Sequence, residues 1–173
     1  MGFWADANTE PKRADRFLMY INGIPEWMIS KTGKPSPKIS VVKKQYLNHT
    51  FKYPGKVEWE SITFTLNDPV EPDASATLMN ILWKSGYAFP DAPNDHSTIS
   101  KARAIAALGN VHIDTLGADG EVTERWRPVN AWISGFKLSD QDYAADEMNN
   151  AEVTIEFDYA ELDLTIAGDR ASK

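Results

Sequence analysis

The chain has 173 residues, a formal net charge of −7, no cysteine, and six tryptophans among 42% hydrophobic residues. This length and apolar content suit one domain with a sizeable core, whereas the acidity disfavours tight binding to nucleic acid or to an anionic membrane surface. The lack of cysteine excludes disulfides and thiolate metal sites, and no apolar run reaches transmembrane length. No signal peptide is expected at the start of the chain, so the cytoplasm is the expected compartment of synthesis.

The first part of the chain is expected to be a flexible arm followed by two short strands. Residues 1–15 are polar apart from Phe3 and Trp4. These two aromatic residues are either incidental or a means of docking the arm on a neighbouring molecule. Strands are predicted at residues 16–22 and 27–29, because apolar residues alternate there around an Asn-Gly turn signal.

A long hairpin is predicted over residues 38–66, with its return limb at residues 57–66. The tip, residues 47–56, contains the turn pair Pro54-Gly55 and interleaves aromatic with basic residues. Such a tip suits contact with an acidic protein partner; a nucleic-acid surface and a plain solvated hairpin are the alternatives. The residues that we expect to contact another subunit are Phe51, Lys52, Tyr53 and Lys56.

A helix is predicted over residues 73–85, because Asp73 can cap its start and Gly86 can close its end. Its apolar face indicates that it packs against the core. Residues 101–108 are undecided between helix and loop, since alanine favours a helix but the run is short. Further strands are predicted at residues 111–116 and 122–127.

The end of the domain, residues 130–162, is predicted to be two strands joined by a long acidic connection. In the second strand apolar residues alternate with polar ones, which predicts one buried and one solvated face. The buried set is Val153, Ile155, Phe157 and Tyr159. In the first strand one face holds Ile133, Gly135 and Lys137, and the other holds Trp132, Ser134, Phe136 and Leu138.

The connection between these strands, residues 139–150, is far longer than a hairpin requires, so we expect it to contact another molecule. Its acidic residues are Asp140, Asp142, Asp146 and Glu147. Their spacing partly matches a calcium-binding loop, but the glycine and the final glutamate of such a loop are missing.

No catalytic, cofactor or metal site is predicted, and the chain is not expected to be an enzyme. The three histidines are far apart in sequence, and the common nucleotide-binding and hydrolase motifs are absent. Glu58 and Glu60 lie two residues apart, as a glycosidase pair might, but a solvated acidic face is the commoner cause of such a pattern.

From about residue 16 to residue 162 the order of these elements resembles the tail tube protein of contractile-tailed bacteriophages. The segments that carry this resemblance are RFLMYI, WESITFTLND, the helix with Leu82 and Trp83, and the ending NAWISGFKLSD…EVTIEFDYAEL. Tubes of type VI secretion systems and of related injection particles share the architecture that this family implies.

The resemblance implies an antiparallel β-sandwich or barrel with one flanking helix, which assembles into a hexameric ring with a continuous inner β-barrel. Such rings stack into a tube that conducts DNA and tape-measure protein, without tight DNA binding and without a membrane. The implied partners are further copies of the chain and the tail sheath, baseplate, terminator and tape-measure proteins. The implied location is the virion tail, with residues 163–173 as a C-terminal tail.

The polar faces of the predicted strands suggest a lumen lined by carboxylates, because an acidic bore would repel phosphates and let DNA slide. Which face of the sheet turns inward does not follow from the sequence, and solubilising charges on the outer surface are the alternative. The candidate lumen residues are Glu58, Glu60, Glu152, Glu156 and Asp158.

Other functions remain open beside the tube itself. A tube initiator or terminator of the same fold, or the tube of another injection system, would share these features. Six tryptophans also suit a carbohydrate-binding β-sandwich, which would stay monomeric and bind glycans. A small all-β hydrolase with a carboxylate pair would turn over glycosides.

Overall fold

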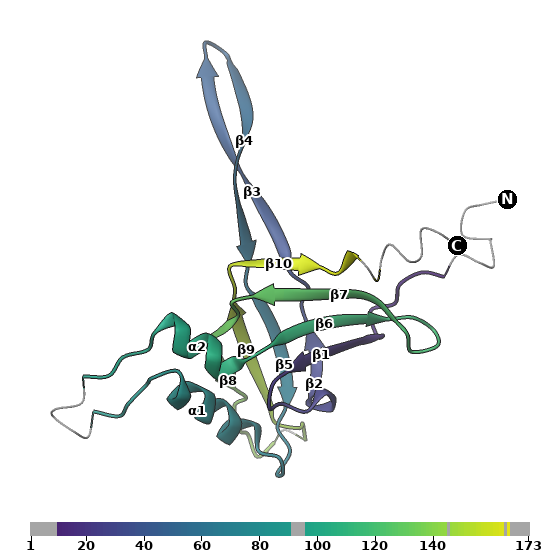
Figure 1. Cartoon of the computed structure of the whole chain (residues 1–173), viewed down its shortest axis with the longest axis vertical. Coiled ribbons are helices and arrows are strands. Elements are labelled where there is room, and N and C mark those ends of the chain that lie inside the picture. The colour runs from purple at the N-terminus through teal and green to yellow at the C-terminus, as the bar shows by residue number, and fades with distance from the viewer. Residues whose placement is uncertain (1–9, 91–95, 145, 165, 167–173) are drawn as a thin grey trace.

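The computed structural model describes residues 10–90, 96–144, 146–164 and 166. These residues form two four-stranded sheets, a separate two-stranded hairpin and two α-helices, and all paired strands are antiparallel (Figure 1). The mainly β, antiparallel fold predicted from the sequence is therefore confirmed.

The two sheets draw their strands from distant parts of the chain. Sheet A has the order β1 (Phe17–Ile21), β6 (Val111–Leu116), β7 (Val122–Val129) and β10 (Tyr159–Leu162). Sheet B has the order β2 (Ile29–Thr32), β5 (Ile62–Asn67), β9 (Asn150–Glu156) and β8 (Trp132–Leu138). The hairpin consists of β3 (Ser36–Tyr46) and β4 (His49–Glu60), and a 3-10 turn, Glu26–Met28, precedes β2.

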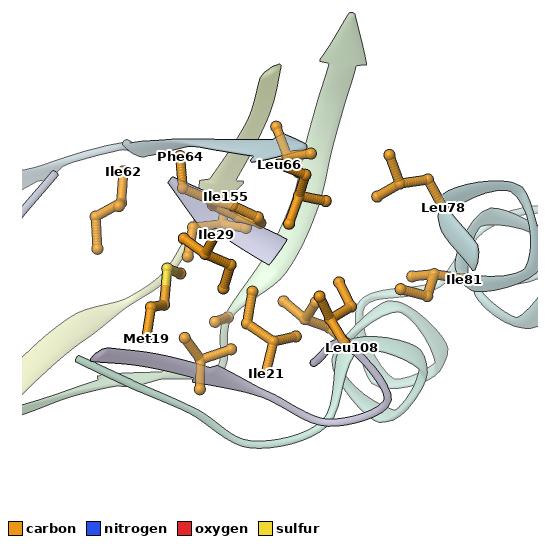
Figure 2. Packing of buried hydrophobic residues seen from close by; sticks show 14 of the residues in the cluster. Met19, Ile21, Ile29, Ile62, Phe64, Leu66, Leu78, Ile81, Leu108 and Ile155 are labelled. Atoms are coloured by element: carbon orange, nitrogen blue, oxygen red, sulfur yellow. The ribbon is translucent and has the colours of Figure 1, made fainter. Parts of the chain in front are cut away.

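The core lies between the inner faces of the two sheets and extends under the helices. Figure 2 shows Met19 and Ile21 of β1 facing Phe64 of β5 and Ile155 of β9. All four side chains are at most 1% exposed. Period-two alternation explains this burial, because every second residue of a strand points to the same face.

The helices α1 (Ala74–Lys84) and α2 (Lys101–Leu108) close one side of the core. Asp73 caps α1 as predicted, since its carboxylate accepts a hydrogen bond from the backbone N–H of Ala76 at 3.0 Å. Leu78 of α1 and Leu108 of α2 are fully buried. The undecided residues 101–108 are helical, so two helices and not one flank the sandwich.

The last strand predicted from the sequence is correct as far as Phe157. Val153, Ile155 and Phe157 are buried as expected, but Tyr159 is 46% exposed and does not share their face. The chain leaves sheet B after Glu156, and Asp158 donates its backbone N–H to Val129 of β7 at 3.0 Å. The placement of Tyr159 was wrong because the chain crosses to sheet A at this point.

The face assignment in β8 was also wrong, because the strand contains a β-bulge. Its register against β9 shifts between Ile133 and Gly135. As a result Ile133 and Phe136, which strict alternation places on opposite faces, both pack against the core.

The hairpin turn lies at Leu47 and Asn48, and not at Pro54-Gly55 as predicted. Leu47 adopts a left-handed backbone conformation with φ of 51°. Pro54 and Gly55 lie inside β4, in a region where its register against β3 shifts. The predicted return limb is divided in two, because β4 ends at Glu60 and β5 begins at Ile62.

The described part of the expected N-terminal arm is attached to the domain. Arg16 donates a hydrogen bond to the Glu10 carboxylate at 3.1 Å, and Lys12 is paired with Glu124 of β7. Phe3 and Trp4 lie outside the described residues, as does most of the expected C-terminal tail.

Glu124 joins the N-terminal segment and the start of the hairpin to sheet A. Its carboxylate accepts hydrogen bonds from Lys12, from Lys34 at 2.9 Å and from the indole N–H of Trp126 at 2.6 Å. Burial alone would raise the pKa of Glu124, but these three donors outweigh it and lower the pKa to about 2.

We expect Glu124→Gln to lower the free energy of unfolding at pH 7 by only about 1–2 kcal/mol, because both lysine partners are largely exposed and water screens their attraction to the carboxylate. The folded-state pKa is depressed, so the wild-type advantage is complete above the ordinary carboxyl pKa of 4.5 and is lost as the pH falls toward about 2. Urea unfolding at several pH values measures this difference. Glu71→Gln, at an exposed position, is the control; equal losses in both variants would contradict the role of Glu124.

Candidate assembly interface

The β3–β4 hairpin projects from the domain and is solvated on both faces (Figure 1). Every residue of β3 is exposed. The large apolar side chains that the hairpin exposes are Ile39, Val41, Val42, Tyr46, Leu47, Phe51, Tyr53 and Val57. An isolated two-stranded hairpin is marginally stable in water, and a large exposed apolar surface marks an interaction site.

The hairpin prolongs the β2–β5 pair of sheet B beyond the end of that sheet. Only residues 33–35 separate β2 from β3, and only Ser61 separates β4 from β5. The two segments stay paired across this gap, since Gly33 donates its backbone N–H to Thr63 at 3.1 Å. The tip therefore lies far from the core along the strand direction (Figure 1).

The outer half of the hairpin is basic. Lys43 and Lys52 are direct cross-strand partners, and Lys44 is next in β3. Like charges directly opposite one another destabilise a strand pair, so this arrangement favours an anionic partner. Lys52 was predicted for this surface, whereas Lys43 and Lys44 were not. The sequence could have indicated them, because Lys43 and Lys44 form a Lys-Lys pair in the limb of the predicted hairpin that faces Lys52.

The acidic connection between β8 and β9 lies at the opposite end of the domain. The hairpin leaves β5 at Ile62, whereas Asn67 at the far end of β5 pairs with Asn150, where the connection ends. Figure 1 places the hairpin tip and this connection at the two ends of the long axis. The described acidic side chains of the connection, Asp140, Asp142, Asp146 and Glu147, are all exposed.

The connection surrounds a depression of about 600 Å³ whose lining includes Asp140, Asp142 and Glu147. Ser139 and Asn150 close its base through a backbone hydrogen bond of 2.9 Å. Tyr143 and Met148 add exposed apolar surface to it. Within the described part of the chain, no group of three or more His, Asp or Glu residues is placed to hold a metal ion.

The outward face of sheet B is polar and mixed in charge. Glu152 of β9 is flanked in register by Thr65 of β5 and Lys137 of β8, and Lys31 of β2 pairs with Thr65 on its far side. Glu156 lies on the same face of β9 as Glu152. The outer edges of this sheet, β2 and β8, have no partner strand within the described residues.

The five candidate lumen carboxylates do not form one group. Glu58 and Glu60 lie at the base of the hairpin, opposite Lys38 and Ser36, and not on sheet B. Asp158 lies between β9 and β10, where it accepts hydrogen bonds from Lys101 and Asn130, each at 2.7 Å. The hydrogen bond from Lys101 is the largest cause that lowers the pKa of Asp158.

The outward face of sheet A carries a cluster that sequence reasoning missed. Arg125 of β7 makes a bidentate ion pair with Asp114 of β6, with both N–O distances 2.7 Å. His112 stacks on Tyr20 of β1 with ring centroids 4.8 Å apart, and burial is the largest cause of its lowered pKa. The register across the predicted turn at residues 117–120 does not indicate the Asp114–Arg125 pair, because the pairing of β6 with β7 shifts between Thr115 and Leu116.

No protein-family model and no curated protein sequence matches this chain. Solved structures are similar over nearly its whole length. A chain in the sheath-tube complex of an extracellular contractile injection system, PVC, has a TM-score of 0.65 and 14% identity over 94% of this chain and 98% of its own. The fold is that of a contractile-injection-system tube protein.

Two further structures extend this likeness to neighbouring parts of such systems. A chain of the tube-terminating cap of the anti-feeding prophage has a TM-score of 0.64 and 18% identity, covering 94% of this chain and 99% of its own. A chain of the baseplate of the same particle has a TM-score of 0.63 and 12% identity, covering 90% and 97%. The tube-type fold predicted by the resemblance is confirmed.

Proposed function

We propose that the chain is a structural subunit that forms rings, and that these rings stack into the inner tube of a contractile injection apparatus such as a phage tail. The observation that carries the proposal is that surfaces of opposite charge lie at the two ends of the long axis of the domain. A basic apolar hairpin projects from one end, and an acidic connection covers the other. A subunit whose two ends complement one another forms head-to-tail contacts that can repeat without limit.

Ring formation follows from the open edges of sheet B. The four strands are antiparallel, so the edge strands β2 and β8 run in opposite directions. Joining β8 of one copy to β2 of the next therefore continues the antiparallel pattern, and a closed ring removes both exposed edges. Six copies are proposed, in keeping with the 6-fold symmetrised baseplate that contains a similar chain.

Amide hydrogen exchange tests the ring directly. At a concentration where assemblies form, backbone amides on the free sides of β2 and β8 should exchange more slowly than in dilute monomer. Amides of β6, which is paired on both sides within the chain, should keep the same rate and serve as the control. Assemblies that leave β2 and β8 unprotected would contradict a continuous inner barrel.

The outward face of sheet B is proposed to line the lumen, with Glu152 and Glu156 as its acidic residues. Glu58 and Glu60 would lie at the rim, since they belong to the hairpin base. Lys31 and Lys137 balance the glutamates on this face, so the wall would be polar and close to neutral instead of strongly acidic. Such a wall suits passage of DNA and of a tape-measure protein without tight binding.

Wild-type protein should not retard duplex DNA in a gel at physiological salt, because neither its net charge of −7 nor this face supplies enough cations. Glu152→Lys with Glu156→Lys should create measurable, salt-sensitive retardation, because the face then carries four lysines. Glu71→Lys with Glu121→Lys adds the same charge elsewhere and is the control. Sub-micromolar binding of duplex DNA by the wild-type chain would contradict the proposal of an inert conduit and would indicate a DNA-binding function instead.

The proposed partners are further copies of the chain, then the sheath outside the tube, the baseplate at one end and a terminator at the other. These partners are suggested by the assemblies in which similar chains occur. The proposed location is the virion or an extracellular injection particle. No helix among the described residues is long and apolar enough to cross a membrane.

A tube cap is the second candidate, because similar chains occur in a tube-terminating cap and in a sheath/tube terminator with TM-scores of 0.64 and 0.63. A cap would form discrete rings that bind one end of a tube and do not stack on one another. Electron microscopy of the purified chain separates the two roles: tubes indicate the tube subunit, and single rings at every concentration indicate the cap.

A further inference from the structure

An apolar groove of about 220 Å³ lies between the two helices and the edge strand β8. Its floor includes Leu78 and Ile81 of α1 and Ala104 of α2, which are all buried. Figure 2 shows Leu78 and Ile81 pointing from α1 toward the core. Ile133 and Phe136 of β8 form the opposite wall. An apolar cavity of about 150 Å³ holds benzene, so this groove has room for an aromatic side chain.

The polar side chains of the groove are already hydrogen-bonded within the chain. Ser85 donates its hydroxyl to the carbonyl oxygen of Leu82 at 2.6 Å, and Ser134 donates to that of Thr154 at 3.2 Å. Gly135, which also lines the groove, leaves open space beside β8, because a Cβ atom there would meet nothing within 4 Å. A glycine inside a strand often marks the close approach of another chain, and an apolar side chain suits this lining best.

The groove lies at the edge of sheet B that we propose to join to β2 of the neighbouring subunit. Within the sheet, Ile133 pairs with Ile155, and Ile155 pairs with Ile62 of β5. Gly33, which follows β2, is hydrogen-bonded to Thr63 of β5. The end of β2 and the groove therefore lie at a similar height along the strands. A segment that leaves one subunit beside the end of β2 would meet the groove of the next subunit.

The N-terminal arm, residues 1–15, leaves the domain on the β2 side. Lys12 and Lys34 both bind the Glu124 carboxylate, so residue 12 lies beside the segment that follows β2. Figure 1 shows this part of the arm on the side of the domain opposite the helices. Trp4 precedes Lys12 by eight residues, which can span at most about 26–29 Å. Adjacent strands are only about 4.8 Å apart, so this length suffices to reach across a ring junction.

We propose that the arm of each subunit docks on the next subunit of the same ring, with Trp4 inserted into the groove between α1, α2 and β8. Phe3 and Trp4 are the only aromatic residues of this otherwise polar arm, and water favours burial of such large apolar rings. The subunit's own groove is at the far edge of sheet B, beyond β5 and β9. This proposal rests on the proposed ring and adds an exchange of arms to it.

Chemical cross-linking tests the contact, because the chain has no cysteine of its own. Ala5→Cys with Ser134→Cys places one thiol beside Trp4 and the other at the groove. In assembled rings, a short bismaleimide should join subunits into a ladder of linked chains on a denaturing gel. Dilute monomer should give no ladder. Ala5→Cys with Ser139→Cys moves the second thiol to the exposed acidic connection and is the control.

Two variants test the role of the tryptophan and of the groove. Trp4→Ser should weaken the ladder several-fold and, in the cysteine-free chain, raise the concentration needed for ring formation by roughly tenfold. Ala104→Leu fills the groove from its floor and should have the same two effects. Tyr143→Ser removes a fully exposed aromatic ring from the connection and should leave ring formation unchanged. Sedimentation velocity measures ring formation, and thermal unfolding of dilute Trp4→Ser protein should match wild type.

The results separate this proposal from the one on which it rests. Rings that form without a ladder, or a ladder that Trp4→Ser leaves unchanged, would overturn the docking of the arm and leave the ring subunit in place. A cross-link within one chain in dilute monomer, detected by mass spectrometry, would place the arm in its own groove and overturn the exchange. A chain that forms neither rings nor a ladder at any concentration would overturn both proposals.

Discussion

Reversing the charge of two lysines at the hairpin tip is expected to abolish stacking. Lys43→Glu with Lys52→Glu places glutamates opposite the acidic connection that we propose as their partner in the next ring. At about 0.5 kcal/mol for each exposed ion pair, two pairs per subunit around a six-membered ring contribute about 6 kcal/mol. Their loss should raise the concentration needed for tube growth by roughly four orders of magnitude, as measured by sedimentation.

A charge swap provides the control for this prediction. Without the lysine changes, Asp140→Lys with Asp142→Lys should also prevent tube growth, because the connection then repels the basic outer half of the wild-type hairpin. Combining both pairs of changes in one chain should restore tubes, since attraction returns with reversed sign. Tubes from the Lys43/Lys52 variant alone, or no rescue in the combined variant, would exclude the connection as the partner of the tip.

Phe64→Ala is expected to cause the largest loss of stability, about 3–5 kcal/mol. Phe64 is fully buried at the centre of sheet B, where it packs between the two sheets (Figure 2). Removing its ring leaves a cavity that the rigid neighbouring strands cannot fill. Urea unfolding, performed at a concentration below that of assembly, measures the loss.

The same substitution at an exposed site separates core packing from ring formation. Phe51 is 46% exposed on the hairpin, so Phe51→Ala should change the free energy of unfolding of the monomer by less than about 0.5 kcal/mol. Similar losses at the two positions would mean that the inter-sheet core is not where the structure places it.

The alternating strands were the most predictable part of the fold. Val153, Ile155 and Phe157 are buried as the period of two predicts, because one face of sheet B covers the core and the other meets solvent. The capped helix α1 was equally clear, since Asp73 and the apolar stripe that includes Leu78 are local signals.

The errors arose where a distant strand decides the local conformation. Pro54-Gly55 favours a turn by local preference, yet both residues lie inside β4, where a Cβ atom at position 55 would crowd Ser40 of the opposite strand. The bulge in β8 is likewise a property of its pairing with β9. A single sequence contains no direct signal for such register shifts, so side-chain faces beyond them were assigned wrongly.

The candidate interface was predicted in outline only. The sequence indicated a projecting tip and an acidic connection, and the structure adds that they lie at opposite ends of the domain. Lys56 lies at the bulge and not in the outer half of the hairpin. Lys43, which lies directly opposite Lys52, therefore takes the place of Lys56 in the basic surface of the outer half. Residue type and spacing along the chain identify charges, but only strand pairing shows which of them share a surface.

Sedimentation velocity of the wild-type chain over a wide concentration range, combined with electron microscopy of the same samples, tests the central claim most directly. The account predicts that monomers at low concentration give way to six-membered rings with an open centre, and that these rings stack into tubes as the concentration rises. A chain that remains a monomer at the highest concentration would contradict the account.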